Sequence, residues 1–317
     1  MQSSILKKKP FAYIYSFRNK IYKIILALSF SIGLYLYYSK KIKICLCVIG
    51  KNENLYIKEF INHYKKLGYN KIFLYDNNDL EGERFESIIQ KEIKEGYIKL
   101  IDYRGVRGQN INPQLKAFKD CYEKNSLKYD WLSFFDIDEY LKLIPSNLKI
   151  QNFLNNKRYK HCQNVKINWL IYRSNNSLFY ENKSLEDRIN IPLYNTVINN
   201  HIKSTVRGKL PINYWSNASN PHTSINNFIS CSSSGKIIDC KSARNKPPDY
   251  EFAYLKHLHF KSFEEYCNKI KRGRPIPQYK IFRENKIKEL FEFNKNNTIK
   301  LKILLKVFNE SNKYLQK

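Results

Sequence analysis

Several patterns that define other protein classes are missing from this sequence of 317 residues. The seven cysteines include no CxxC pair and no Cys/His spacing typical of a zinc site. No internal repeat is present. The loop Gly50-Lys51-Asn52-Glu53 is too acidic and too poor in glycine to be the Gly-rich phosphate loop of a nucleotidyltransferase.

Acidic residues are scarce: 28 Asp and Glu face 56 Lys and Arg, a formal net charge of +28. Such a charge suggests a polyanionic partner, and a membrane-anchored polyanion-binding protein is one hypothesis. The lysines are spread along the chain, however, and Lys, Asn, Ile and Tyr are all abundant, as AT-rich coding produces. We therefore expect no nucleic-acid partner, although a basic surface would attract a pyrophosphate-bearing ligand.

The sequence has ample material for a core, with 43% hydrophobic and 15% aromatic residues. This is enough for one large α/β domain or two small ones. Cys45 and Cys47 alternate along an apolar run and are expected in the core. Cys231 and Cys240 bracket a Ser-rich segment, and a disulfide between them is one possibility.

An uncharged apolar run lies near the N-terminus, and residues 21–39 are predicted to be a single-pass membrane anchor after a basic tail, residues 1–20. A cleaved signal peptide and a buried core helix are the alternatives. The positive flank predicts a cytoplasmic N-terminus. The rest of the chain would then face the Golgi or ER lumen in a eukaryote, or lie at the cell membrane in a bacterium.

Apolar runs typical of strands alternate with stretches of helical spacing from residue 42 onward. The pattern favours an α/β fold with a mostly parallel sheet covered on both faces. Strands are expected at 42–49, 71–75, 97–101, 131–135, 165–172 and 252–260, and helices at 54–67, 85–94, 114–124 and 262–271. Residues 174–250 are expected to form loops around a ligand site, and 276–317 a helical extension.

Polar residues follow the expected strands and should meet at one edge of the sheet, where ligands of such folds bind. Asp136-Ile137-Asp138 directly follows Trp131-Leu-Ser-Phe-Phe135. Two carboxylates on one side of a strand end are costly to bury without a cation. We expect them to hold Mn²⁺ or Mg²⁺, with Asp136 also near a bound phosphate-bearing ligand. An acidic turn without metal is the alternative.

Further candidates come from the other strand ends. Lys51, Asn52 and Glu53 follow the first strand, where a base, ribose or phosphate would bind, although a capped helix gives the same pattern. Asp76 ends the second strand and is a candidate for a base N–H or for an Asx turn.

The last expected strand carries His257 and His259 on one side, so one imidazole is a candidate third metal ligand. Lys261 and Arg272 follow and are candidates for binding a diphosphate group. Basic side chains in such a run are more commonly solvent-exposed charges.

In order along the chain, these residues resemble glycosyltransferase family 92 and its family-2-like relatives over about 43–275. The matching positions are Lys51-Asn52-Glu53, Tyr56, Glu59, His63, Leu67-Gly68, Asp76-Asn77, Gln114, Ala117, Cys121, Trp131, Asp136 to Tyr140, Trp169, Asp187-Arg188, Lys203-Ser204, His222, His257 to Ser262, Lys269 and Arg272-Gly273.

The resemblance implies a GT-A fold (Rossmann-like) over residues 42–275, a nucleotide-sugar donor (often UDP-galactose), a divalent cation and inversion at the sugar carbon. The acceptor would be a glycan or glycolipid. The resemblance favours His259 as the third metal ligand. It makes Asp187 the candidate general base for the acceptor hydroxyl. Relatives tend to have Glu-Arg where this chain has Asp187-Arg188, and Phe where it has Tyr140.

Overall fold

The computed structural model describes residues 25, 42–106, 112–175, 177–210, 228–239 and 242–272. Residues 1–42 and 43–317 form two separate units. The predicted anchor at 21–39, except Ile25, lies outside the described residues, as do the basic tail and the C-terminal extension. Among the helices described, none has both the length and the apolar character needed to cross a membrane.

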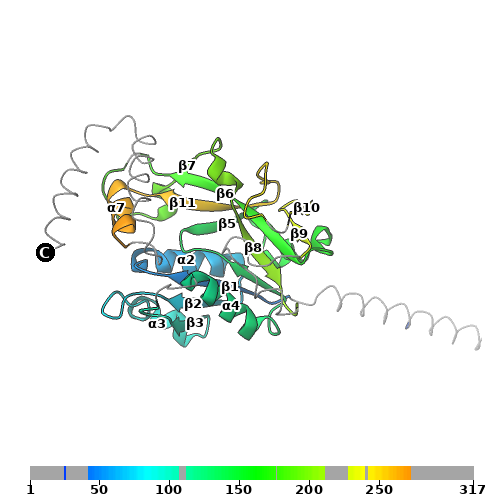
Figure 1. The fold of residues 1–317 in the computed structure, drawn as a ribbon, viewed down its shortest axis with the longest axis horizontal. Helices are drawn as coiled ribbons and strands as arrows, with labels where there is room; N and C mark the ends of the chain where they lie inside the picture. Colours follow the sequence, from blue (N-terminus) through cyan, green and yellow to red (C-terminus); the bar gives the residue numbers. More distant parts are fainter. Residues whose placement is uncertain are drawn as a thin grey trace, which may run out of the picture. The chain divides into compact units, whose positions relative to one another are not determined.

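The N-terminal half of the second unit is a parallel sheet with helices between its strands, as predicted (Figure 1). The strand order is β3-β2-β1-β4, and all three pairings are parallel. We call residues 44–134 the parallel region. Its elements are β1 Ile44–Gly50, α2 Asn54–Leu67, β2 Lys71–Asp76, α3 Glu86–Lys94, β3 Ile98–Asp102, α4 Pro113–Asn125 and β4 Trp131–Phe134.

Local sequence explains the helix ends in this region. Asn112 caps α4 by accepting a hydrogen bond from the Gln114 N–H, with Pro113 in the first turn. Gly68 ends α2 at φ +97°, a left-handed conformation that favours glycine. Cys45 and Cys47 are buried in the core, as predicted. That core packs α4 against the strands through Ala117, Phe118, Cys121, Tyr122, Phe73, Tyr75, Leu132 and Phe134.

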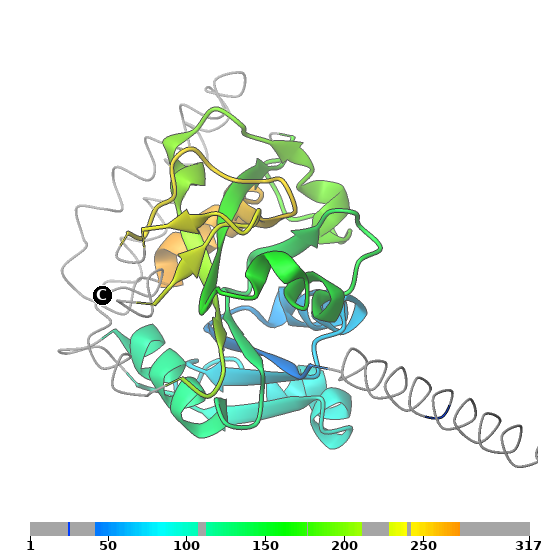
Figure 2. The same cartoon turned by 90° about the vertical axis from the view of Figure 1, so that its right-hand side faces the viewer.

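The C-terminal half extends and curls the sheet through antiparallel as well as parallel pairings, so the whole sheet is mixed and not mostly parallel as predicted. We call residues 139–272 the mixed region. β4 pairs with β8 (Ile202–Arg207), and β8 pairs with the first half of β6 (Asn164–Arg173). The second half of β6 pairs with β11 (Ala253–Phe260), which pairs with β5 (Glu139–Leu143). Strand β6 therefore joins the β4–β8 pair to the β11–β5 pair (Figures 1 and 2).

The elements of the mixed region are β5 Glu139–Leu143, α5 Ile150–Leu154, η1 Lys157–Tyr159, β6 Asn164–Arg173, α6 Leu185–Arg188, β7 Ile191–Pro192, η2 Val197–Asn200, β8 Ile202–Arg207, β9 Ser230–Cys231, β10 Ile237–Ile238, β11 Ala253–Phe260 and α7 Phe263–Arg272. A capping box begins α7: the Ser262 N–H donates to Glu265 Oε2, and the Glu265 N–H donates to Ser262 Oγ.

Two expectations for this half were wrong. Residues 174–250 are not all loops, because β8 lies inside the sheet; its Lys203, Ser204 and Thr205 are polar yet buried, so no apolar pattern marks the strand. Cys231 is bonded to Cys162, not to Cys240, which lies outside the described residues. The β6–β9 pairing, Val165 opposite Cys231, brings these cysteines together across 69 residues of sequence.

Candidate active site

The carboxyl ends of β1 and β2 meet at one edge, as predicted from the strand pattern. Gly50 lies opposite Asp76 in the register, and the Asn77 N–H donates to the Gly50 carbonyl at 2.9 Å. The Asn52 N–H donates to Asn78 Oδ1 at 2.7 Å, with Asn52 at φ +53°. The first two predicted motifs therefore form one interlocked pair of turns.

The third motif packs against the first through Gly50. A Cβ at Gly50 would lie 2.3 Å from Ile137 Cδ1 and 2.9 Å from Phe85 Cζ. Such distances are far below van der Waals contact, so glycine is required for the Asp136-Ile137-Asp138 loop to approach the end of β1 this closely. All three strand-end motifs thus converge.

Asp136 is held by three side chains. Gln114 Nε2 donates to its Oδ1, and Lys203 Nζ lies 2.8 Å from its Oδ2. Its N–H donates to Glu139 Oε2 at 3.0 Å. Lys203 also lies 3.7 Å from Glu139 Oε1. Burial raises the pKa of Glu139 well above its ordinary value, while Lys203 acts in the opposite direction.

Asp138 has a different set of neighbours. Lys269 Nζ lies 2.6 Å from Oδ2, and His257 Nε2 lies 3.6 Å from Oδ1. Burial opposes its ionisation, but the charges of Lys269, His257 and Lys261 hold its pKa well below the ordinary value. Asp138 is therefore a carboxylate that is buried and already neutralised.

His257, rather than His259, contacts the Asp138 carboxylate. His257 is buried, and its Nδ1 has no hydrogen-bond partner in the part of the chain that the structure describes. The His259 ring lies 5.1 Å from the His257 ring, centroid to centroid, and is half-buried. The role predicted for His259 stays a prediction.

Chemically, this donor set suits a hard divalent cation, because two carboxylates and an imidazole are available. The orphaned Nδ1 and the 3.6 Å pair of Asp138 and His257 fit such a use. However, the ligand atoms of Asp136, Asp138 and His257 do not all lie within 4.8 Å of one another. Within the described ranges, the group of three ligand atoms within 4.8 Å of one another is His161, Cys162 and Cys231, where the disulfide lies, and not the Asp136 loop.

The residues predicted to bind the donor also have partners within the protein. Lys51 forms an ion pair with Asp79 at 3.0 Å. Asp76 Oδ1 accepts from the Asn78 N–H and from Asn78 Nδ2, the Asx turn that was the alternative reading. Neither contact tests a role in donor binding.

Glu53 and Lys261 are both buried and lie 3.7 Å apart, and Lys261 Nζ sits 3.3 Å from the centroid of the Tyr56 ring. Burial lowers the pKa of Lys261, against the attraction of Glu53. The side chain of Arg272 lies outside the described residues.

Asp187, the predicted base, is not brought to Asp138. It is exposed in the short helix α6, where Ser184 Oγ donates to its Oδ2 at 2.6 Å. Its neighbour Glu186 pairs with Lys142 of β5. Glu139 stands three residues before Lys142 and so faces the other side of this strand, the side of the metal candidates.

Sequence reasoning assigned no role to Gln114, Lys203 and Lys269, which contact the two aspartates directly. All three stood among the positions of the family resemblance, and that was the available signal. The residue type of the two lysines gave no signal, because Lys and Arg make up 56 of 317 residues.

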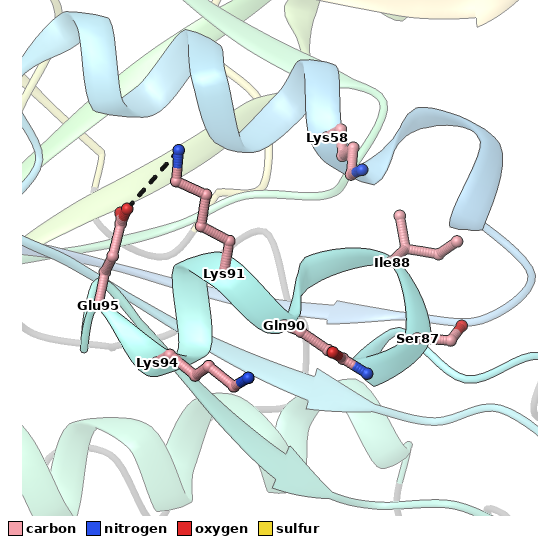
Figure 3. A pocket seen from close by; sticks show the side chains of 7 residues that line it. All are labelled: Lys58, Ser87, Ile88, Gln90, Lys91, Lys94 and Glu95. Carbon is pink, nitrogen blue, oxygen red and sulfur yellow. Dashed lines mark ion pairs between the residues drawn. The ribbon is translucent and has the colours of Figure 1, made fainter.

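Two hollows lie elsewhere. One of about 590 Å³, between α2 and α3, is lined by Lys58, Ser87, Ile88, Gln90, Lys91, Lys94 and Glu95 (Figure 3). Its Lys91 is 3.9 Å from Glu95. The other, of about 500 Å³, lies between β3 and α4. No predicted site residue lines either hollow, so neither is the candidate active site.

The family model of glycosyltransferase family 92 matches residues 40–291. The chain therefore belongs to this family, and the resemblance described above is confirmed. A family 92 protein of Ricinus communis is 26% identical over 119 residues, 36% of this chain and 20% of that protein. One of Oryza sativa subsp. japonica is 26% identical over 116 residues, 37% of this chain and 19% of that protein. The match thus spans about a fifth of these relatives.

Solved structures show only a distant likeness. A mannosyltransferase of Pyrobaculum calidifontis, in complex with GDP-Man and Mn²⁺, has TM-score 0.40 and 12% identity, over 78% of this chain and 70% of that one. TarS of S. aureus with UDP-GlcNAc has TM-score 0.39 and 12% identity, over 71% and 64%. These values are too low to carry an argument about function.

Proposed function

We propose that this chain is a metal-dependent glycosyltransferase of GT-A architecture. It would transfer a hexose such as galactose from a UDP-sugar donor to a glycan or glycolipid acceptor. The transfer would invert the configuration at the sugar carbon. The observation that carries the proposal is the convergence of the Asp136-Ile137-Asp138 loop with the ends of β1 and β2. Family membership supplies the reaction class.

Asp136, Asp138 and His257 would hold the cation, with His259 as the sequence-based alternative to His257. A bound divalent cation would offset the charge that builds on the leaving diphosphate. Lys203 and Glu139 keep the loop in place, because Lys203 bridges Asp136 and Glu139 while the Asp136 N–H is bonded to Glu139.

The donor nucleoside would lie over the turns at the ends of β1 and β2. Lys51, Asn52, Glu53 and Asp76 are proposed to bind it, with Lys261 and Arg272 toward its phosphates. Asn52 has a left-handed backbone conformation, and its N–H donates to Asn78 Oδ1, so the turn after β1 is fixed to the turn after β2. The +28 charge favours the approach of a polyanionic donor.

The acceptor base is a separate part of the proposed mechanism. Asp187 is proposed from the family pattern, while its carboxylate is bonded to Ser184 on the other side of β5 from Glu139. A general base contributes typically 10²–10⁴-fold to the rate. If Asp187 is the base, Asp187→Asn lowers kcat by at least about a hundredfold; retention of kcat within a few-fold excludes it from that role.

The test of the whole proposal is a screen of nucleotide-sugars for thermal stabilisation and transfer, with and without Mn²⁺. We expect one donor to stabilise the protein selectively, and Asp138→Ala to abolish Mn²⁺-dependent turnover. Asp130→Asn is the matched control, since Asp130 lies beside the opposite end of the same strand, β4, and accepts from the Lys43 N–H. Metal-independent activity, or full activity in Asp138→Ala, would refute the metal role.

We also propose that residues 21–39 anchor the chain in a membrane with the N-terminus in the cytoplasm, so that transfer occurs close to the bilayer. The Cys162–Cys231 disulfide supports an oxidising compartment such as the Golgi or ER lumen. Resistance of the full chain to carbonate extraction, together with protection of residues 43–272 from added protease in sealed vesicles, is the expected result. Release by carbonate would contradict it.

A further inference from the structure

The two aspartates of the candidate metal site are each neutralised by a lysine, but the two lysines differ. Lys203 comes from β8, and its side chain is 0% exposed. It serves two carboxylates, Asp136 and Glu139. Lys269 comes from α7 and is 32% exposed, and within the described ranges its carboxylate partner is Asp138, at 2.6 Å.

These differences decide which lysine is able to leave its partner. Moving Lys203 away from Asp136 and Glu139 would leave its own fully buried ammonium without a counter-charge, which is strongly unfavourable. Lys269 is partly hydrated already, and its flexible four-carbon stem allows the ammonium to swing into solvent at small cost. Lys203 is therefore a fixed counter-ion, and Lys269 an exchangeable one.

Each oxygen of Asp138 has a neighbouring nitrogen while Lys269 is in place. Its Oδ2 is bonded to Lys269 Nζ, and its Oδ1 is 3.6 Å from His257 Nε2. A divalent cation needs direct contact with carboxylate oxygens, at roughly 2.0–2.2 Å for ions of this kind. An ammonium at hydrogen-bond distance and a cation at that distance compete for the same oxygen.

We propose that Lys269 is an exchangeable counter-ion of Asp138: it holds the carboxylate while the cation site is empty, yields to a divalent cation, and then offers its ammonium to the donor diphosphate. This inference rests on the proposed function. Helix α7 then couples cation binding to donor binding, because Lys269 moves from Asp138 to the donor diphosphate. Lys269 contacts the Asp138 carboxylate when no cation is bound, and the donor when the cation is bound.

The experiment measures Mn²⁺ binding to the full chain without donor, from the signal of free Mn²⁺ in electron paramagnetic resonance. Lys269→Met removes the competing ammonium but keeps the apolar stem, and we expect it to bind Mn²⁺ about tenfold more tightly than the wild type. At saturating Mn²⁺ we expect Lys269→Met to bind UDP, tested beside GDP, about tenfold more weakly. Lys269→Arg, which keeps the charge, should lie near the wild type in both.

Lys142→Met is the matched control, because Lys142 is a lysine of similar exposure whose partner is Glu186 on the other face of β5. It removes the same net charge from the protein, so an equal gain in Mn²⁺ affinity would show a general charge effect and overturn the proposal. Unchanged Mn²⁺ affinity in Lys269→Met, with binding abolished by Asp138→Asn, would overturn the exchange but leave the metal site standing. Absence of Mn²⁺ binding in both the wild type and Lys269→Met would overturn the metal site and the exchange together.

Discussion

The parallel and mixed regions of this protein are stabilised in different ways. In the parallel region, β1 is the apolar run ICLCVIG, and charged side chains lie at strand ends and on helix surfaces. In the mixed region, Lys166, Arg188, Lys203, Lys256 and Lys261 are buried. One region is held by apolar contact, which tolerates small changes of shape. The other depends on charges that are each met by a partner, so loss of a single partner is severe.

The largest effect we expect is on the buried pair of Arg188 and Glu265. Arg188 Nη1 and Nη2 donate to the two Glu265 oxygens at 2.8 and 3.0 Å, and Tyr56 Oη donates at 2.7 Å. Glu265→Ala leaves the guanidinium buried and unpaired, which should lower the free energy of unfolding by about 3–5 kcal/mol. Denaturant titration measures this, with the exposed neighbour Glu264→Ala as control. A loss below about 1 kcal/mol would show that water compensates Arg188.

The same pair makes the free energy of unfolding depend on pH. This effect should be smaller than that of Glu265→Ala, because protonation of Glu265 leaves part of the hydrogen bonding in place. Burial opposes ionisation of Glu265, but its bonds from Arg188, Ser262 and Tyr56 lower its pKa from 4.5 to about 2. With the folded pKa depressed, this stabilisation is present above pH 4.5 and is lost as the pH falls through 2. In denaturation at fixed pH, the advantage of wild type over Glu265→Gln should shrink in that window. A constant difference would contradict the assignment.

At the boundary between the two regions, Gly50→Ala tests how tightly the Asp136 loop is packed. The new methyl would meet Ile137 Cδ1 at 2.3 Å, so overpacking should lower stability by about 1–3 kcal/mol. Ile137→Val removes that Cδ1 atom, and the double variant should recover part of the loss in thermal unfolding. Additive losses in the double variant would show that Ile137 is not the obstacle.

The smallest effect belongs to the parallel region. Asn112→Ala removes the side chain that caps α4, and should lower stability by about 1 kcal/mol. Because Gln114, in the first turn of α4, contacts Asp136, donor binding should weaken together with stability. Lys116→Ala, an exposed change in the same helix, is the control for both measurements. An unchanged donor affinity would separate the cap from the site.

The parallel region was predictable almost element by element. Its strands are short apolar runs, and its turns carry their own signals, such as Gly68 after α2 and Asp76-Asn77-Asn78 after β2. These patterns are local, since each residue's conformation depends mainly on near neighbours. Their convergence at one edge followed from the rule for parallel sheets.

The mixed region resisted prediction because its decisive contacts join distant residues. Lys203 pairs with Asp136, which lies 67 positions away, and Lys269 pairs with Asp138, which lies 131 away. A lysine in a chain with 56 Lys and Arg carries no local sign that it will be buried. Asp187 was chosen from the family pattern, and only the fold shows that it lies on the other side of β5 from Glu139.

The sequence by itself determined the alternation of strands and helices, the order of the strand-end motifs and the family, because apolar periodicity and short motifs are properties of neighbouring residues. The tertiary structure alone decided that Cys162 pairs with Cys231, that His257 rather than His259 contacts Asp138, and that a buried and a partly exposed lysine neutralise the two aspartates. Charge pairing in a buried site depends on distance and desolvation, and these exist only after the chain has folded.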